Sequence, residues 1–128
     1  MAGSSRVFDG DYATTTCASG DFDPLQACAE ACVDYLVHDR WLVRRLPKLV
    51  RTAGFELVRS GIYSYMEAPS SDGYMLAIVD RGADALVATG RVTSEMAEEL
   101  KAEARRRSDA GEFFGHIAYA SVVARKPL

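Results

Sequence analysis

The side chains in this sequence that could carry chemistry gather where predicted strands end. Asp9-Gly10-Asp11 closes the first predicted strand, and Tyr12 follows it. In an open α/β sheet, ligands bind at the carboxyl ends of the strands, so Asp11 and Tyr12 would face a crevice. The alternative is a turn in which an aspartate bonds its own backbone. The residue types alone leave both interpretations open.

Aromatic residues lie near the ends of the other two predicted strands. Tyr63, Tyr65, Phe113 and Phe114 share one rim if the middle strand runs parallel to the first and the last runs antiparallel. There they could wall an apolar pocket for a small molecule, or they could be core residues. His116 could be a general base or a structural residue on a buried strand. No residue can be assigned as catalytic from the sequence.

The cysteines and histidines are too few for a metal site. Cys28 and Cys32 are four residues apart, one helical turn, so they could face the same way. The third cysteine is Cys17, and the only histidines are His38 and His116. We therefore expect buried, reduced thiols and no bound metal.

Nucleotide-binding and common hydrolase motifs are absent from the sequence. It contains no G-x-G-x-x-G, P-loop, H-E-x-x-H, G-x-S-x-G or C-x-x-C pattern. The ten glycines are scattered as turn and cap residues. A self-contained enzyme that uses ATP or a dinucleotide is therefore not expected.

Length and composition are those of one globular domain, here predicted over 1–128. The chain has 128 residues, of which 48% are hydrophobic and 26% charged. The formal net charge is −3, which disfavours nucleic acid as a partner. No apolar run reaches the roughly 18 residues that span a membrane, and Met1–Ser5 lacks the apolar core of a signal peptide. We expect a cytoplasmic protein with no membrane partner.

Periodicity and turn residues predict the element order β-α-α-β-α-α-β. The expected ranges are a strand at 6–11, helices at 23–38 and 41–53, a strand at 55–66, a turn at 69–73, helices at 73–88 and from 93 to Gly111, and a strand at 113–125. The last strand is apolar on both faces, so it should be covered on both. The middle strand has mixed polarity, which suits a sheet edge.

Capping residues set the expected helix ends. Asp23 is a predicted N-cap, with Pro24 at the first helical position and Gln26 placed for a capping box. Pro47 should open the regular part of the second helix, because a proline further inside would break it. Thr93 caps the last helix. The predicted stop residues are Gly54, Gly90 and Gly111.

Several of these segments together resemble a known family. Residues 6–14, Arg-Val-Phe-Asp-Gly-Asp-Tyr-Ala-Thr, resemble the fifth strand and following turn of class I S-adenosylmethionine-dependent methyltransferases. Residues 45–55 resemble the next helix, which ends in Ala-Gly-Phe, and residues 93–100 are similar to the inserted helix of a small-molecule subgroup. Residues 109–127 resemble the seventh strand. The likeness runs from about Arg6 to Pro127.

The resemblance implies part of a Rossmann-like methyltransferase sheet. It would have about three strands, with the last strand antiparallel and central, and residues 73–111 would form a helical lid inserted into the domain. S-adenosylmethionine is the cofactor of the complete fold, but strands one to four, which carry its binding loop, have no counterpart here. The resemblance therefore assigns no cofactor-binding residue, and this chain alone should bind no cofactor. The substrate-side positions it implies are Asp11, Tyr12, Tyr65 and Phe113.

These features predict the substrate-side, C-terminal part of a methyltransferase that acts on a small molecule and is inactive alone. The alternative is a non-enzymatic binding or dimerisation module derived from that fold. The expected partners are a small-molecule acceptor and either a second copy or a separate N-terminal half, since an unpaired sheet edge favours association. The short segment before the first strand leads us to expect a truncation or a reannotated reading frame.

Overall fold

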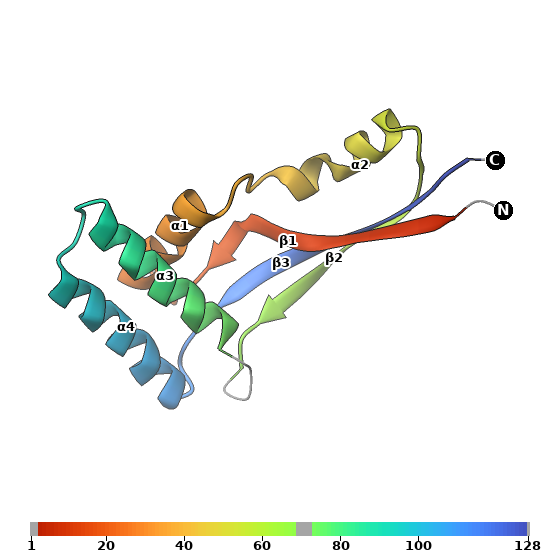
Figure 1. The fold of residues 1–128 in the computed structure, drawn as a ribbon. Coiled ribbons are helices and arrows are strands. Elements are labelled where there is room, and N and C mark those ends of the chain that lie inside the picture. Colours follow the sequence, from red (N-terminus) through yellow and green to blue (C-terminus); the bar gives the residue numbers. More distant parts are fainter. Residues whose placement is uncertain (1–2, 69–72, 128) are drawn as a thin grey trace. The chain divides into compact units, whose positions relative to one another are not determined.

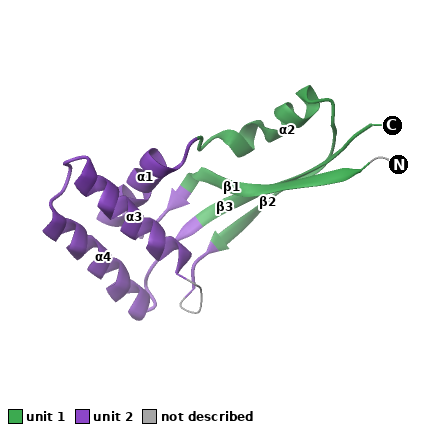
Figure 2. Ribbon diagram, in the orientation of Figure 1, with its two compact units in different colours: residues 1–14, 39–65, 117–128 green, residues 15–38, 66–116 purple. Residues whose placement is uncertain are grey.

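The computed structural model describes residues 3–68 and 73–127 (Figure 1). The chain divides into two compact units (Figure 2). Unit 1 comprises Met1–Thr14, Asp39–Tyr65 and Ile117–Leu128, and unit 2 comprises Thr15–His38 and Met66–His116. The turn predicted at 69–73 lies, apart from Gly73, outside the described residues. That 1–128 folds as a single domain stays a prediction.

The strands form a three-stranded antiparallel sheet in the order β1-β3-β2. They are β1 (Ser4–Thr16), β2 (Glu56–Met66) and β3 (His116–Arg125). Lys126 N–H donates to the Gly3 carbonyl at 3.3 Å, at one end of the β1–β3 pair. Arg125 lies 3.0 Å from the Glu56 carboxylate, beside the start of β2. The prediction that the last strand is antiparallel and central is therefore confirmed.

Burial follows the position of each strand in the sheet. In β3, Ile117 and Val122 point to opposite faces, and they are 0% and 2% exposed. In β2, Val58 and Ile62 are exposed. On each face, the side chains of a central strand are flanked by those of two neighbouring strands, so less of their surface is exposed than on an edge strand. The edge position predicted for the middle strand is confirmed.

The first strand is longer than predicted. It continues to Thr16, so Asp11 lies within the strand and does not close it. The run Thr14–Thr16 is β-branched and favours extended backbone. The expectations that Asp9–Asp11 forms a turn and that Asp11 and Tyr12 sit at the strand's carboxyl end are therefore wrong.

The helix of unit 1, α2 (Leu42–Thr52), contains its proline. Pro47 was expected to open the regular helix, but α2 begins five residues earlier, and that expectation is wrong. The carbonyl of Val43 loses its usual helical donor there, because proline has no N–H. Gly54 follows the helix with φ +90°, which confirms its predicted role as the stop.

Unit 2 contains three helices, α1 (Pro24–Leu36), α3 (Tyr74–Ala88) and α4 (Ser94–Asp109). α3 packs against both α1 and α4. Leu25, Met75 and Val79 are completely buried in its core. Gly82 of α3 meets α1 so closely that a Cβ there would overlap the carbonyl oxygen of Cys28. The lack of a side chain at Gly82 therefore sets how near α1 and α3 can approach.

The predicted N-caps of unit 2 are confirmed, with one difference. The Asp23 carboxylate accepts the Leu25 N–H at 3.0 Å, and Thr93 Oγ1 accepts the Met96 N–H at 3.2 Å. Gln26 forms no capping box. Its side-chain oxygen instead accepts the N–H groups of Cys17 and Ala18, at 2.7 and 3.2 Å. It thus holds the connection between β1 and α1.

No helix in the described part of the chain is both long and apolar enough to cross a membrane. With the seven elements placed, the described residues form a mixed α/β fold of one antiparallel sheet and four helices.

Replacing Ile117 by aspartate should unfold the sheet of unit 1. The side chain is fully buried on the central strand, and an unpaired buried carboxylate is very costly. We expect a loss of more than about 4 kcal/mol in the free energy of unfolding, measured by urea denaturation. The control is Val58→Asp, at an exposed position of edge strand β2. If both variants lost the same stability, β3 would not be the central strand.

Replacing Gly82 by alanine should destabilise unit 2. The added methyl group would overlap the Cys28 carbonyl, so α1 and α3 would have to separate. Overpacking of this kind typically costs about 1–3 kcal/mol. Gly20→Ala is the matched control, because a Cβ at Gly20 meets no atom within 4 Å. Equal melting temperatures for the two variants would contradict the close approach of α1 and α3.

Candidate functional site

Asp11, one of the four residues expected to bind substrate, is held in an ion pair in unit 1. It is 7% exposed. Nε of Arg44 in α2 donates to both carboxylate oxygens, at 3.0 and 3.2 Å. The Arg44 guanidinium also lies 4.8 Å from the centre of the Trp41 ring. The Asp11 carboxylate therefore ties β1 to α2.

The other three expected residues are distributed over both units. Tyr12 and Tyr65 are partly buried on β1 and β2, the two strands that β3 separates. Phe113 lies in unit 2, in the loop between α4 and β3. The structure therefore does not gather all four residues in one described site, and a substrate contact at each stays a prediction.

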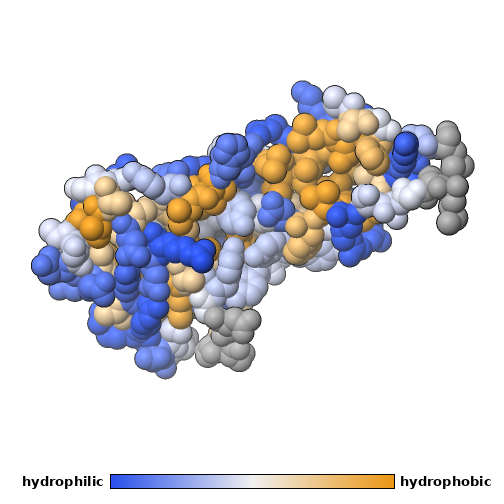
Figure 3. All heavy atoms as spheres, in the orientation of Figure 1, coloured by the Kyte–Doolittle hydropathy of each residue, from blue (hydrophilic) through white to orange (hydrophobic). Residues whose placement is uncertain are grey.

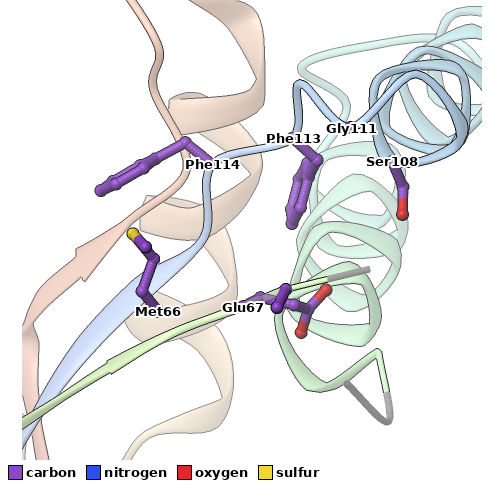
Figure 4. Close-up of a pocket in the computed structure, with 7 residues that line it drawn as sticks. Met66, Glu67, Ser108, Gly111, Phe113 and Phe114 are labelled. Carbon is purple, nitrogen blue, oxygen red and sulfur yellow. The ribbon is translucent and has the colours of Figure 1, made fainter. Parts of the chain in front are cut away.

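Phe113 does line a pocket of unit 2, shown in Figure 4. The pocket has a volume of about 240 Å³. Its walls come from the end of β2, the last turn of α4 and the loop before β3. The lining residues are Met66, Glu67, Ala68, Ser108, Gly111, Phe113 and Phe114. It is the concave, mainly apolar kind of surface that binds small molecules.

The end of α4 fixes the aromatic wall of this pocket. Gly111 has φ +72°, which lets the chain turn out of the helix. The N–H groups of Glu112 and Phe113 then both donate to the Arg107 carbonyl, at 2.7 and 3.1 Å. These bonds hold the backbone that carries the Phe113 ring. The glycine stop visible in the sequence is thus what places Phe113.

Glu67 is the site residue that the sequence interpretation missed. It is 8% exposed, and its N–H donates to the Gly115 carbonyl at 2.9 Å. Its Oε1 accepts the Met75 N–H at 2.6 Å, in the first turn of α3. Gly73 at the helix N-cap has no side chain to do this. A glycine N-cap offers no side-chain acceptor to the first N–H groups of a helix. Gly73 is therefore the signal in the sequence that an acceptor from another part of the chain is needed.

Three consecutive arginines near the end of α4 are each paired with carboxylates of unit 2. Arg105 pairs with Asp80 at 2.6 Å. Arg106 and Arg107 share Glu103, at 2.6 and 2.8 Å. Arg107 also donates to Asp23 at 2.6 Å, joining the end of α4 to the start of α1.

The contact between Asp23 and Arg107 contributes to a lowered pKa of the Asp23 carboxyl group. Burial acts to raise the pKa, but the hydrogen bonds from Arg107 and from the backbone of Ser19 and Leu25 outweigh it and lower the pKa from 3.8 to about 2. The same bond to Asp23 raises the pKa of Arg107. Both groups are therefore charged in the folded protein at neutral pH.

The cysteines are poor nucleophiles. Burial raises the pKa of Cys17 to about 12 and that of Cys28 to about 11, and it also raises the pKa of Cys32. A thiol, not a thiolate, is then present at neutral pH, and the thiolate is the reactive form. Within 3–68 and 73–127, no three His, Cys, Asp or Glu side chains are grouped to hold a metal ion.

Three glycines allow close approaches within the protein. Cβ atoms at Gly82 and Gly115 would overlap Cys28 and Met75, and one at Gly10 would meet Ile117 and Tyr12. These three glycines therefore serve internal packing and leave no space beside them for S-adenosylmethionine.

No family model, curated protein or solved structure matches this chain. The methyltransferase relationship accordingly stays a proposal, argued from the motifs and the strand order.

The Asp23–Arg107 pair should make stability depend on acid pH. The pKa of Asp23 is lowered in the folded state, so its contribution is present above about pH 4 and is lost as pH falls toward 2. Asp23→Asn can still cap α1 but has no charge. We expect it to cost about 1–3 kcal/mol at pH 7 and to flatten the fall in stability between pH 4 and 2, measured by urea denaturation.

The control for this pair is Asp84→Asn, which removes an exposed carboxylate from the Lys101 pair. That variant should keep nearly the wild-type pH profile. Parallel profiles for Asp23→Asn and wild type would show that the Asp23 carboxylate does not carry the predicted stabilisation.

Proposed function

We propose that this chain is the substrate-side, C-terminal part of an S-adenosylmethionine-dependent methyltransferase for a small molecule, with a Rossmann-like sheet completed by another polypeptide segment. The observation that carries the proposal is the strand order β1-β3-β2, with the last strand central and antiparallel. This is the arrangement that the motif resemblance implies.

In this proposal the unit 2 pocket holds the acceptor. Phe113 belongs both to the pocket and to the residues expected to bind substrate. α3 and α4 occupy the segment 73–111 expected to act as a lid. Catalysis would come from holding the acceptor in line with the methyl donor and from excluding water. In this proposal the methyl donor is held by the separate segment, because the motifs that resemble the family include none of its cofactor-binding loop.

A separate donor-binding half is the partner this proposal requires. In the described sheet β1 is an edge strand, with β3 as its one neighbouring strand. An edge strand can act as a template for another strand. We place the docking of the donor-binding half along this edge.

The alternative function is a non-enzymatic binding or dimerisation module. The observation in its favour is the exposed apolar surface of unit 1, where Figure 3 shows hydrophobic side chains gathered over α2 and the adjoining strands. On the α2 side of the sheet, the exposed large side chains include Val7, Leu49 and Ile62. On the opposite face, the exposed Phe8 ring stacks on Tyr119, with centroids 5.2 Å apart, and lies 6.3 Å from the Tyr63 ring. Apolar patches of this kind mark interaction sites.

Complementation separates the two functions. The chain is mixed with an N-terminal fragment, containing strands one to four, of a class I methyltransferase that acts on small molecules. Formation of S-adenosylhomocysteine is then measured with each of several small-molecule acceptors. The chain alone should bind no S-adenosylmethionine by calorimetry, and the mixture should transfer methyl groups. Phe113→Ala should lower the mixture's rate about tenfold through lost apolar contact. Met96→Ala, at an exposed position of α4, should leave the rate unchanged.

A stable homodimer by light scattering, with no methyl transfer in any mixture, would favour the module over the enzyme. Binding of S-adenosylmethionine by the chain alone would contradict the proposed division of the fold.

A further inference from the structure

The turn before α1 presents a phenylalanine to solvent in an unusual backbone conformation. Phe22 is fully exposed, and its φ is +58°, in the left-handed region. Among the described residues it is the only non-glycine with a positive φ. Bulky side chains rarely adopt this conformation, and such strain persists only where the surrounding structure imposes it.

Hydrogen bonds to the residue after Phe22 hold this turn. The Asp23 carboxylate accepts the Ser19 N–H at 2.9 Å and the Ser19 hydroxyl at 3.2 Å. Arg107 and the Leu25 N–H donate to the same carboxylate, at 2.6 and 3.0 Å. Phe22 lies between Ser19 and Asp23, so its ring projects from a fixed backbone. A contact through this ring would therefore cost little further ordering of the chain.

Unit 1 contains an apolar groove with room for one aromatic ring. Its volume is about 260 Å³, whereas a cavity of about 150 Å³ can hold benzene. The groove, called here the unit 1 groove, is formed by α2, the start of β1 and the end of β3. Its lining side chains, apart from Ser5, are apolar and include Val7, Leu49, Val50, Ala53 and Ala124.

The two units carry opposite net charge. Unit 1 contains nine basic and four acidic residues, a net charge of +5, whereas unit 2 contains six basic and fourteen acidic residues, a net charge of −8. The same contrast holds locally. Asp21 and Glu30 line the same surface hollow as Phe22. Lys48 and Arg51 are neighbours of groove-lining residues in α2.

We propose that copies of this chain associate head to tail, with the Phe22 ring of one copy seated in the unit 1 groove of another. Burying an aromatic side chain removes about 150–250 Å² of surface from water, which supplies the attraction. The acidic surface around Phe22 then faces the basic side chains beside the groove, and this charge complementarity sets the orientation. The contact is heterologous, since the two copies use different surfaces. The inference does not rest on the proposed function.

Sedimentation velocity on the full chain over a range of protein concentrations tests this contact. The wild-type chain should associate as its concentration rises, and added salt should weaken the association. Phe22→Asn removes the ring and introduces a residue that tolerates positive φ. Leu49→Glu places a carboxylate in the groove. Each variant should raise the dissociation constant at least tenfold.

The controls replace exposed leucines that lie outside the proposed contact. Leu36→Asn changes an exposed residue at the end of α1, and Leu42→Glu changes an exposed residue of α2 that does not line the groove. Both variants should associate like wild type.

A mixture of the two contact variants tests whether the contact is heterologous. The Leu49→Glu copy keeps Phe22, and the Phe22→Asn copy keeps its groove, so each mixed pair retains one intact contact. The mixture should form heterodimers, whereas neither variant should self-associate.

A wild-type chain that stays monomeric at every concentration would overturn the inference, as would association that Phe22→Asn leaves unchanged. Absence of heterodimers in the mixture, with both variants folded by circular dichroism, would also overturn it. If Leu49→Glu fails to fold, the comparison of Phe22→Asn with Leu36→Asn still decides. All these measurements use the chain alone, so failure of methyl transfer in the complementation assay would leave this inference standing.

Discussion

The insertion of β3 between β1 and β2 is the constraint on which the sheet depends. In the described sheet β1 and β2 are not hydrogen-bonded neighbours, so their backbones are joined through β3. Both faces of β3 are buried, with Ile117 on one face and Ala118, Ala120 and Val122 on the other. In β2, by contrast, Val58 and Ile62 remain exposed.

The sequence predicted the features that depend on local rules. The N-caps at Asp23 and Thr93 and the stops at Gly54 and Gly111 all act within one helical turn, and each was placed correctly. The apolar pattern of the last strand predicted that both of its faces are covered, and its central position was what the family resemblance implied; the strand order confirms that position. Element order and type were therefore accessible without coordinates.

The errors share a different cause, which is that a distant residue decides the outcome. Asp11 reads as a turn residue, yet Arg44, far along the chain, takes its carboxylate and the strand continues. Glu67 has no local signature either, since its partner is the Met75 amide at the start of another element. Of the residues that line the unit 2 pocket, Phe113 and Phe114 were predicted from the sequence and Glu67 was not. Side-chain contacts made across the fold cannot be read from spacing along it.

The late position of β3 also governs how the chain acquires its structure during synthesis. A ribosome releases β1 and β2 well before residues 116–125, so both strands wait with unpaired backbone amides and carbonyls. The hydrogen bond from Lys126 to Gly3 then joins residues that are far apart in sequence. Such non-local closure is slow in folding. β1 and β2 therefore stay unpaired until β3 is available, whereas the helices of unit 2, whose contacts lie closer in sequence, are free to assemble first.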